Sequence, residues 1–297
     1  MTPSNPLRDE SGSTHLDSTA QLMDRITSQL GSQLRLVSLD GSRRPEPPRT
    51  PLVLVAHGSR DPRGLATVTA LAERVRELRP GLTVRLGHIE LNEPLLGDTL
   101  AALRPGPAVL VPLLLGRGQH VKRDIPAVAA RAPHLDCRVA APLGPHPLLA
   151  DALQARLTEA GWPARPGAAA RRRLGVVLAA AGSRDPESAI DTETAAGLLA
   201  ERLGVPVVPA YAAPTAACAR TVPAALDALA AEGRRQAAVA GYFTAPGRFA
   251  AQAAAHAPWI AAAPLGAHPA LARLVLHRYD LARTAPAVAE PRRLTVV

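Results

Sequence analysis

The sequence predicts an α/β protein of two tandem lobes, each a parallel sheet covered by helices, with a cleft between the lobes. Two observations lead to this prediction. Short, continuous apolar runs alternate along the chain with stretches whose apolar residues recur at helical spacing. In addition, two sequence blocks occur twice in the same order at nearly constant separation, which is typical of an internal duplication.

The duplicated blocks lie near the two ends of each unit. Residues 58–62, Gly-Ser-Arg-Asp-Pro, recur identically at 182–186, a separation of 124 residues. The Ala-Pro-Leu-Gly block at 141–144 recurs at 263–266, a separation of 122 residues. Because both blocks keep their order and nearly their spacing, the two units are expected to share one fold.

Each unit is expected to contain four buried strands with helices between them. In the first unit the apolar runs that predict strands are residues 52–56, 82–89, 108–115 and 137–141. Helices are expected over residues 62–79 and 94–103, and from about residues 125 and 146. The corresponding strands of the second unit are expected at residues 175–180, 205–211, 236–243 and 259–262.

Two kinds of helix start are recognisable in the sequence. Asp61 precedes Pro62, which favours an Asp cap with proline at the first helical position. His146 and His268 also precede proline, at equivalent places in the two units. We interpret both histidines as structural helix-start residues, and we interpret Asp124 and Glu93 in the same way.

Proline-rich segments set the expected domain limits. Residues 1–49 are polar and end in a proline-rich run, so a disordered lead is expected there. The lobes are expected at residues 50–160 and 174–283, joined by a linker at 161–173. Residues 284–297 are expected to form a loose tail.

Composition and charge narrow the class of partner. The chain lacks an apolar run of the ~20 residues that a membrane span needs, and its first residues do not resemble a secretory signal. A cytoplasmic protein without a membrane partner is therefore expected. The net charge of +9 suits an anionic partner. Aromatic residues make up only 2%, which disfavours nucleic acid and favours a small polyanionic substrate.

Three residues that can bind metal follow three successive strands of the first unit. His57 follows the first expected strand, Glu90 ends the second, and His120 lies in the glycine-rich loop after the third. Ligands bind at the carboxyl ends of strands in open parallel sheets. Two imidazoles and a carboxylate can hold Fe²⁺, Co²⁺, Ni²⁺ or Zn²⁺ with open positions, although a single histidine at a strand end is more often a cap.

The second unit provides an internal comparison for these residues. Alignment of the two units places Ala181 opposite His57, Ala210 opposite Glu90, and Phe249 opposite His120. All three candidate ligands are thus absent from the second unit, whereas the adjoining 182–186 block is retained. This pattern predicts one active unit and one degenerate unit.

Three segments of the first unit resemble a known enzyme family. Residues 56–60 (Ala-His-Gly-Ser-Arg), 90–94 (Glu-Leu-Asn-Glu-Pro) and 120–126 (His-Val-Lys-Arg-Asp-Ile-Pro) resemble signature segments of the sirohydrochlorin cobalt- and iron-chelatases. The resemblance covers residues 51–158 well and 174–281 weakly. It implies the class II chelatase fold and insertion of Fe²⁺ or Co²⁺ into sirohydrochlorin, for sirohaem or cobalamin biosynthesis.

The resemblance also implies roles for individual residues. His57, Glu90 and His120 would handle the metal, which is a substrate, and the two histidines would deprotonate the macrocycle. Sirohydrochlorin carries several carboxylates, and polar or basic side chains close to the ligands are expected to bind them. These residues are Ser59, Arg60, Arg117, Lys122 and Arg123.

Three other functions use parts of the same pattern. A non-catalytic carrier of metal or tetrapyrrole would need the same residues, and the sequence leaves this alternative open. A histidine phosphatase would need arginine directly before His57, where the chain has Ala56. The argument for a nucleic-acid-binding module would rest on the net charge alone.

Overall fold

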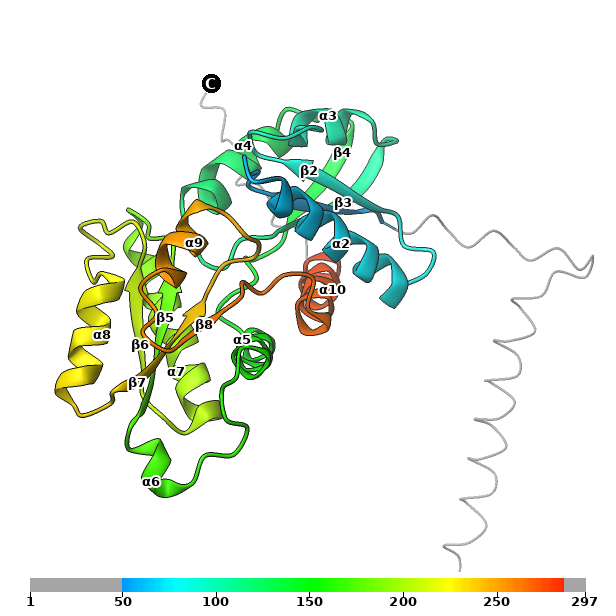
Figure 1. The fold of residues 1–297 in the computed structure, drawn as a ribbon. Helices are drawn as coiled ribbons and strands as arrows, with labels where there is room; N and C mark the ends of the chain where they lie inside the picture. The colour runs from blue at the N-terminus through cyan, green and yellow to red at the C-terminus, as the bar shows by residue number, and fades with distance from the viewer. Residues whose placement is uncertain (1–49, 286–297) are drawn as a thin grey trace, which may run out of the picture. The chain divides into compact units, whose positions relative to one another are not determined.

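The structure is a computed structural model, and it describes residues 50–285 of the chain (Figure 1). The expected lead at 1–49 and nearly all of the expected tail at 284–297 lie outside the described residues. Residues 50–285 belong to one compact unit of the chain, in which the two repeats contact each other extensively.

The first repeat forms a four-stranded parallel sheet. Its strands are β1 (Leu52–Ala56), β2 (Val84–His88), β3 (Gly106–Pro112) and β4 (Leu135–Val139), in the order β2-β1-β3-β4. The chain adds β2 on one side of β1 and β3 on the other. The carboxyl ends of β1 and β3 therefore meet where the strand order reverses, the place where such sheets bind ligands.

The second repeat builds an equivalent sheet. Its strands are β5 (Leu174–Ala180), β6 (Val207–Tyr211), β7 (Gln236–Gly241) and β8 (Ile260–Ala262), in the order β6-β5-β7-β8. The two parallel sheets and the duplication confirm the predicted fold class. The cleft expected between the lobes stays a prediction.

Helices follow the strands in both repeats. The first repeat has α2 (Pro62–Leu78), α3 (Leu96–Ala101), the π-helix η1 (His120–Asp124), α4 (Ile125–Ala129) and α5 (Pro147–Glu159). The second has α7 (Pro186–Leu203), α8 (Val222–Ala231), α9 (Arg248–Ala254) and α10 (Pro269–Thr284), and α6 (Ala168–Arg171) lies in the expected linker.

The helix-start signals act as expected. The Asp61 carboxylate accepts a hydrogen bond from the backbone N–H of Arg63 at 2.9 Å. The Nδ1 atoms of His146 and His268 accept from the second residue of α5 and of α10, at 3.1 and 3.2 Å. Burial lowers the pKa of both histidines, which favours the neutral, accepting form.

Alternate residues of the central strand face two different cores. Leu52 and Leu54 of β1 are fully buried in a large core that continues into the second repeat. Val53 and Val55 are fully buried on the opposite face, against residues of α3 and α4. Both faces of the sheet are therefore apolar, as the continuous apolar run predicts.

The last helix of each repeat packs on the other repeat's sheet. Helix α5 contacts α7, β7 and β8, whereas α10 contacts α2, β3 and β4 (Figure 1). Leu149 and Leu153 of α5 and Leu274 of α10 are at most 1% exposed. The repeats have thus exchanged helices, so the sequence limits at 160 and 174 do not separate two independent cores.

Matched polar contacts hold the exchanged helices. The Arg156 guanidinium in α5 donates to the carbonyl of Leu265 from Nε (3.1 Å) and Nη2 (3.0 Å). At the equivalent place, Nη2 of Arg278 in α10 donates to the carbonyl of Leu143 at 3.1 Å. Each arginine therefore satisfies a loop carbonyl of the other repeat.

Within residues 50–285, every helix is too short or too polar to cross a bilayer.

The helix exchange predicts that the first repeat does not fold alone. A fragment of residues 50–160 would expose the apolar face of α5 and leave β3 and β4 without α10. We expect this fragment to bind a hydrophobic dye and to lack a cooperative thermal transition by circular dichroism. Mixing it with residues 161–285 should restore the transition. A cooperative transition in the isolated fragment, at the melting temperature of the full chain, would contradict this expectation.

Candidate functional site

The three predicted ligands lie together at the carboxyl ends of β1, β2 and β3. His57 Nε2 lies 3.5 Å from Glu90 Oε1. The imidazole rings of His57 and His120 make an edge-to-face contact, with 4.8 Å between ring centroids. His57 and His120 follow the two strands that meet at the switch point, and Glu90 follows the strand on the other side of β1.

These side chains are adjacent but open to solvent. The exposed fractions are 43% for His57, 52% for Glu90 and 35% for His120, so all three can be reached from solvent. Among residues 50–285, His, Cys, Asp and Glu side chains nowhere form a preassembled set of three around a metal-sized space. The group is thus an open cluster, unlike the closed four-ligand cage of a structural metal site.

The loops after β1 and β2 are tied together beside His57. The backbone N–H of Glu90 donates to the carbonyl of His57 at 3.0 Å, and the N–H of Ser59 donates to Asn92 Oδ1 at 2.7 Å. Gly58 has a φ of +104°, and a Cβ atom there would lie 1.8 Å from the carbonyl oxygen of Glu90. Glycine at 58 is therefore required for the close approach that places His57 next to Glu90.

His120 is oriented by a carboxylate that the sequence analysis assigned to another role. Asp124 has helical backbone angles and makes no capping hydrogen bond; its Oδ2 lies 2.7 Å from Nδ1 of His120. When Nδ1 carries the proton, Nε2 is left free to bind a metal or accept a proton. The i, i+4 spacing of His120 and Asp124 in the sequence could have indicated this contact. Glu93 Oε2 accepts from the N–H of Leu95 at 3.1 Å, just before α3, but Leu95 is the N-cap and no side chain caps this helix.

The second repeat holds no equivalent of the ligand set, and one alignment needs correction. Ala213, not Ala210, lies opposite Glu90. The N–H of Ala213 donates to the carbonyl of Ala181, and the N–H of Glu90 donates to the carbonyl of His57 in the same way. Ala210 lies inside β6. The alignment failed because no repeated block fixes the register between residues 187 and 262. Phe249 does lie opposite His120, since each is the second residue after the matching Gly247 or Gly118.

The five expected substrate-binding residues have different surroundings. Within residues 50–285, Arg60 and Arg123 are exposed and form no ion pair. Arg117 and Lys122 pair with carboxylates of the second repeat, at 2.7 Å (Arg117 Nη2 to Asp191) and 2.6 Å (Lys122 to Asp185). The Ser59 hydroxyl accepts from the backbone of its own loop. Contact of these residues with a substrate stays a prediction.

Comparison with known proteins gives a family match over most of the chain. The CbiX family model matches residues 51–160 and 175–282. The sirohydrochlorin cobaltochelatase of Methanopyrus kandleri is 40% identical over 88 residues, which is 29% of this chain. The match spans 62% of that relative's own length.

Solved structures with both repeats have the same fold. SirB from Bacillus subtilis, solved with Fe³⁺, has a TM-score of 0.63 at 24% identity and covers 79% of this chain and 96% of its own. The SirB chelatase of Bacillus subtilis subspecies spizizenii, solved with cobalt, has a TM-score of 0.60 at 21% identity, and the match covers 78% and 94% of the two chains.

Gly58 and its counterpart Gly182 allow a matched test of the geometry at the site. Alanine at either position would be strained by about 1–3 kcal/mol and would also meet a carbonyl oxygen, that of Glu90 or of Ala213. We expect both Gly58→Ala and Gly182→Ala to lower the melting temperature. Gly58→Ala should weaken Co²⁺ binding measured by calorimetry more strongly than Gly182→Ala does, because it alone moves Glu90. Equal Co²⁺ affinities in the two variants would contradict this geometry.

Proposed function

Because the chain belongs to the CbiX family, we propose that it inserts a divalent metal, Fe²⁺ or Co²⁺, into sirohydrochlorin on the way to sirohaem or cobalamin. The cobaltochelatase activity named for the Methanopyrus kandleri relative supports the reaction. The Fe³⁺ with which one SirB structure was solved and the cobalt in the other support the choice of metal.

The observation that carries this proposal is the convergence of His57, Glu90 and His120 in one repeat only. Three strand ends bring a carboxylate and two imidazoles to the sheet's ligand-binding edge. Their structural counterparts Ala181, Ala213 and Phe249 have no metal-binding or proton-accepting groups. The site of metal insertion is therefore assigned to the first repeat.

The open cluster suits a metal that must be bound and then released. Neutral imidazole and carboxylate are competent ligands for Fe²⁺ and Co²⁺. With only three protein ligands, the ion retains open positions at which the ring nitrogens of the macrocycle can replace them one after another. A closed thiolate cage would hold the ion too firmly for this transfer.

The same histidines can accept the protons that metal insertion displaces. Each pyrrole N–H that becomes a metal ligand loses its proton, and Nε2 of His57 or His120 can take it up. The Asp124 carboxylate, 2.7 Å from Nδ1 of His120, stabilises the imidazolium that results. Since both rings are partly exposed, the proton can then pass to water.

The free basic groups around the cluster suit an anionic macrocycle. Arg60 follows His57 by three residues, and Arg123 lies on η1 with His120. Both are exposed and can pair with substrate carboxylates. Substrate contacts of Arg117 and Lys122 would have to compete with their existing ion pairs.

The first test is catalysis itself. Purified protein with sirohydrochlorin and Co²⁺, or with Fe²⁺ under anaerobic conditions, should change the absorption spectrum of the tetrapyrrole at a rate proportional to protein concentration. A rate equal to the uncatalysed control would contradict the proposal. If the protein then still bound Co²⁺ and sirohydrochlorin, a non-catalytic carrier would be the better description.

The second test separates the roles of the three residues. His57→Ala and His120→Ala should each lower kcat by about 10²- to 10⁴-fold, because each removes a proton acceptor as well as a ligand. Glu90→Gln should be milder, and raised metal concentration should restore its rate. His256→Ala, at an exposed histidine beyond α9, is the matched control and should keep the wild-type rate. Full restoration of His57→Ala by metal would contradict this division of roles.

A further inference from the structure

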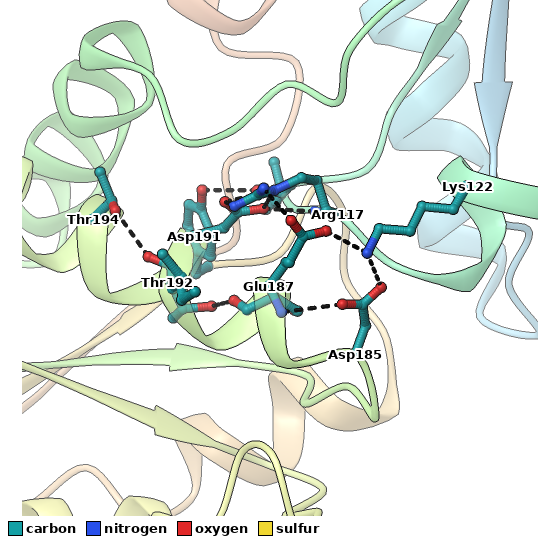
Figure 2. Close-up of polar contacts among 11 residues, drawn as sticks. Arg117, Lys122, Asp185, Glu187, Asp191, Thr192 and Thr194 are labelled. Atoms are coloured by element: carbon teal, nitrogen blue, oxygen red, sulfur yellow. Dashed lines mark hydrogen bonds and ion pairs between the residues drawn. The ribbon is translucent and has the colours of Figure 1, made fainter.

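The loop that carries His120 is anchored to the second repeat by charged side chains (Figure 2). Arg117 lies in this loop, three residues before His120. Its backbone N–H donates to Asp191 Oδ2 at 2.8 Å, and its guanidinium donates to the same carboxylate from Nη2 at 2.7 Å and from Nε at 3.1 Å. Nη1 of Arg117 donates to Glu187 Oε1 at 2.7 Å.

A second cation of the same segment continues this network. Lys122 Nζ, on η1 two residues after His120, lies 2.6 Å from Asp185 Oδ2 and also pairs with Glu187. The hydrogen bond from Lys122 lowers the pKa of the Asp185 carboxyl, so the pair stays charged. His120 is thus flanked on both sides by side chains fixed to the start of α7.

The contact to Asp191 is the most enclosed part of the network. The Asp191 side chain is 5% exposed, and its two oxygens receive several hydrogen bonds from Arg117, one of them from the backbone. A backbone donor fixes the path of the chain as well as the side chain. Gly116 and Gly118 flank Arg117 and have the widest backbone freedom, so the Asp191 contact restricts a loop that would otherwise adopt many conformations.

Comparison of the two repeats shows that these charged contacts exist only at the His120 loop of the first repeat. In the second repeat, Pro246 and Ala251 occupy the places of Arg117 and Lys122. On the facing helix α2, Arg63 and Thr67 occupy the places of Glu187 and Asp191, counted from the matching caps Asp61 and Asp185. The second repeat therefore lacks the ligands but carries carboxylates that face the ligand-bearing loop of the first.

We propose that Asp191, assisted by Glu187, is a positioning residue that holds the His120 loop in its metal-binding conformation. The second repeat contributes to the site by fixing the place of His120 and supplies no ligand of its own. The effect on turnover rests on the proposed function, whereas the effect on binding of the metal alone does not.

The test uses the full-length protein and CoCl₂ as the probe. Asp191→Asn should weaken Co²⁺ binding, measured by calorimetry without sirohydrochlorin, by about 10- to 100-fold, the usual effect of residues that orient metal ligands. In the chelatase assay kcat should fall and KM should not. Arg117→Gln should weaken Co²⁺ binding at least as much, and the double variant should be no worse than Arg117→Gln alone, because both changes remove the contact between the guanidinium and Asp191.

The matched control is another ion pair between the repeats. Arg79, the residue after the end of α2, pairs with Asp280 on α10 through two contacts of 2.7 and 2.8 Å, away from the His120 loop. Arg79→Gln should lower the melting temperature and leave Co²⁺ affinity and kcat unchanged. If Arg79→Gln weakened Co²⁺ binding as much as Asp191→Asn, general loosening of the two repeats would explain the effect and overturn the proposal.

The remaining outcomes separate this inference from the proposed function. If wild-type protein is active and Asp191→Asn keeps both its Co²⁺ affinity and kcat, the positioning role is overturned and the function stands. If no protein is active but Asp191→Asn still weakens Co²⁺ binding, the function is contradicted and the positioning role is supported. Should Asp191→Asn fail to fold, Glu187→Gln, at a 41% exposed side chain, replaces it, and unchanged Co²⁺ affinity there overturns the proposal.

Discussion

One apolar core lies between the two sheets, and the rest of the structure depends on it. The core takes alternate side chains from β1 and β5 and encloses them with α2, α5, α7 and α10. Two of these helices are exchanged between the repeats, so neither sheet is covered on this side by its own repeat alone. Burial of this surface is the dominant favourable contribution to folding, and it requires both repeats at once.

The shared core explains why a repeat without ligands remains in the chain. Ala181, Ala213 and Phe249 have lost the chemistry of the first repeat, yet β5, α7 and α10 keep their place in the common core. With the two repeats fixed against each other, carboxylates at the start of α7 lie within hydrogen-bond distance of Arg117 and Lys122. Rigid packing between the repeats thus sets the position of a loop at the edge of the sheet.

Much of this arrangement follows from local features of the sequence. Apolar runs predicted the strands, and the rule that ligands bind at strand ends brought His57, Glu90 and His120 together correctly. What local features could not supply were contacts between distant residues. The apolar faces of α5 and α10 indicate burial but not which sheet they cover. Likewise, Arg117 and Asp191 are 74 residues apart in sequence, and nothing in either segment indicates the other.

The central claim is that the metal binds at the strand ends of the first repeat, and crystals soaked in CoCl₂ test it most directly. An anomalous difference map at the cobalt absorption edge should show a peak at bonding distance from His57 and His120, next to Glu90. No peak should lie beside Ala181, Ala213 and Phe249. A cobalt peak elsewhere, with the His57 and His120 rings left unliganded, would contradict the claim.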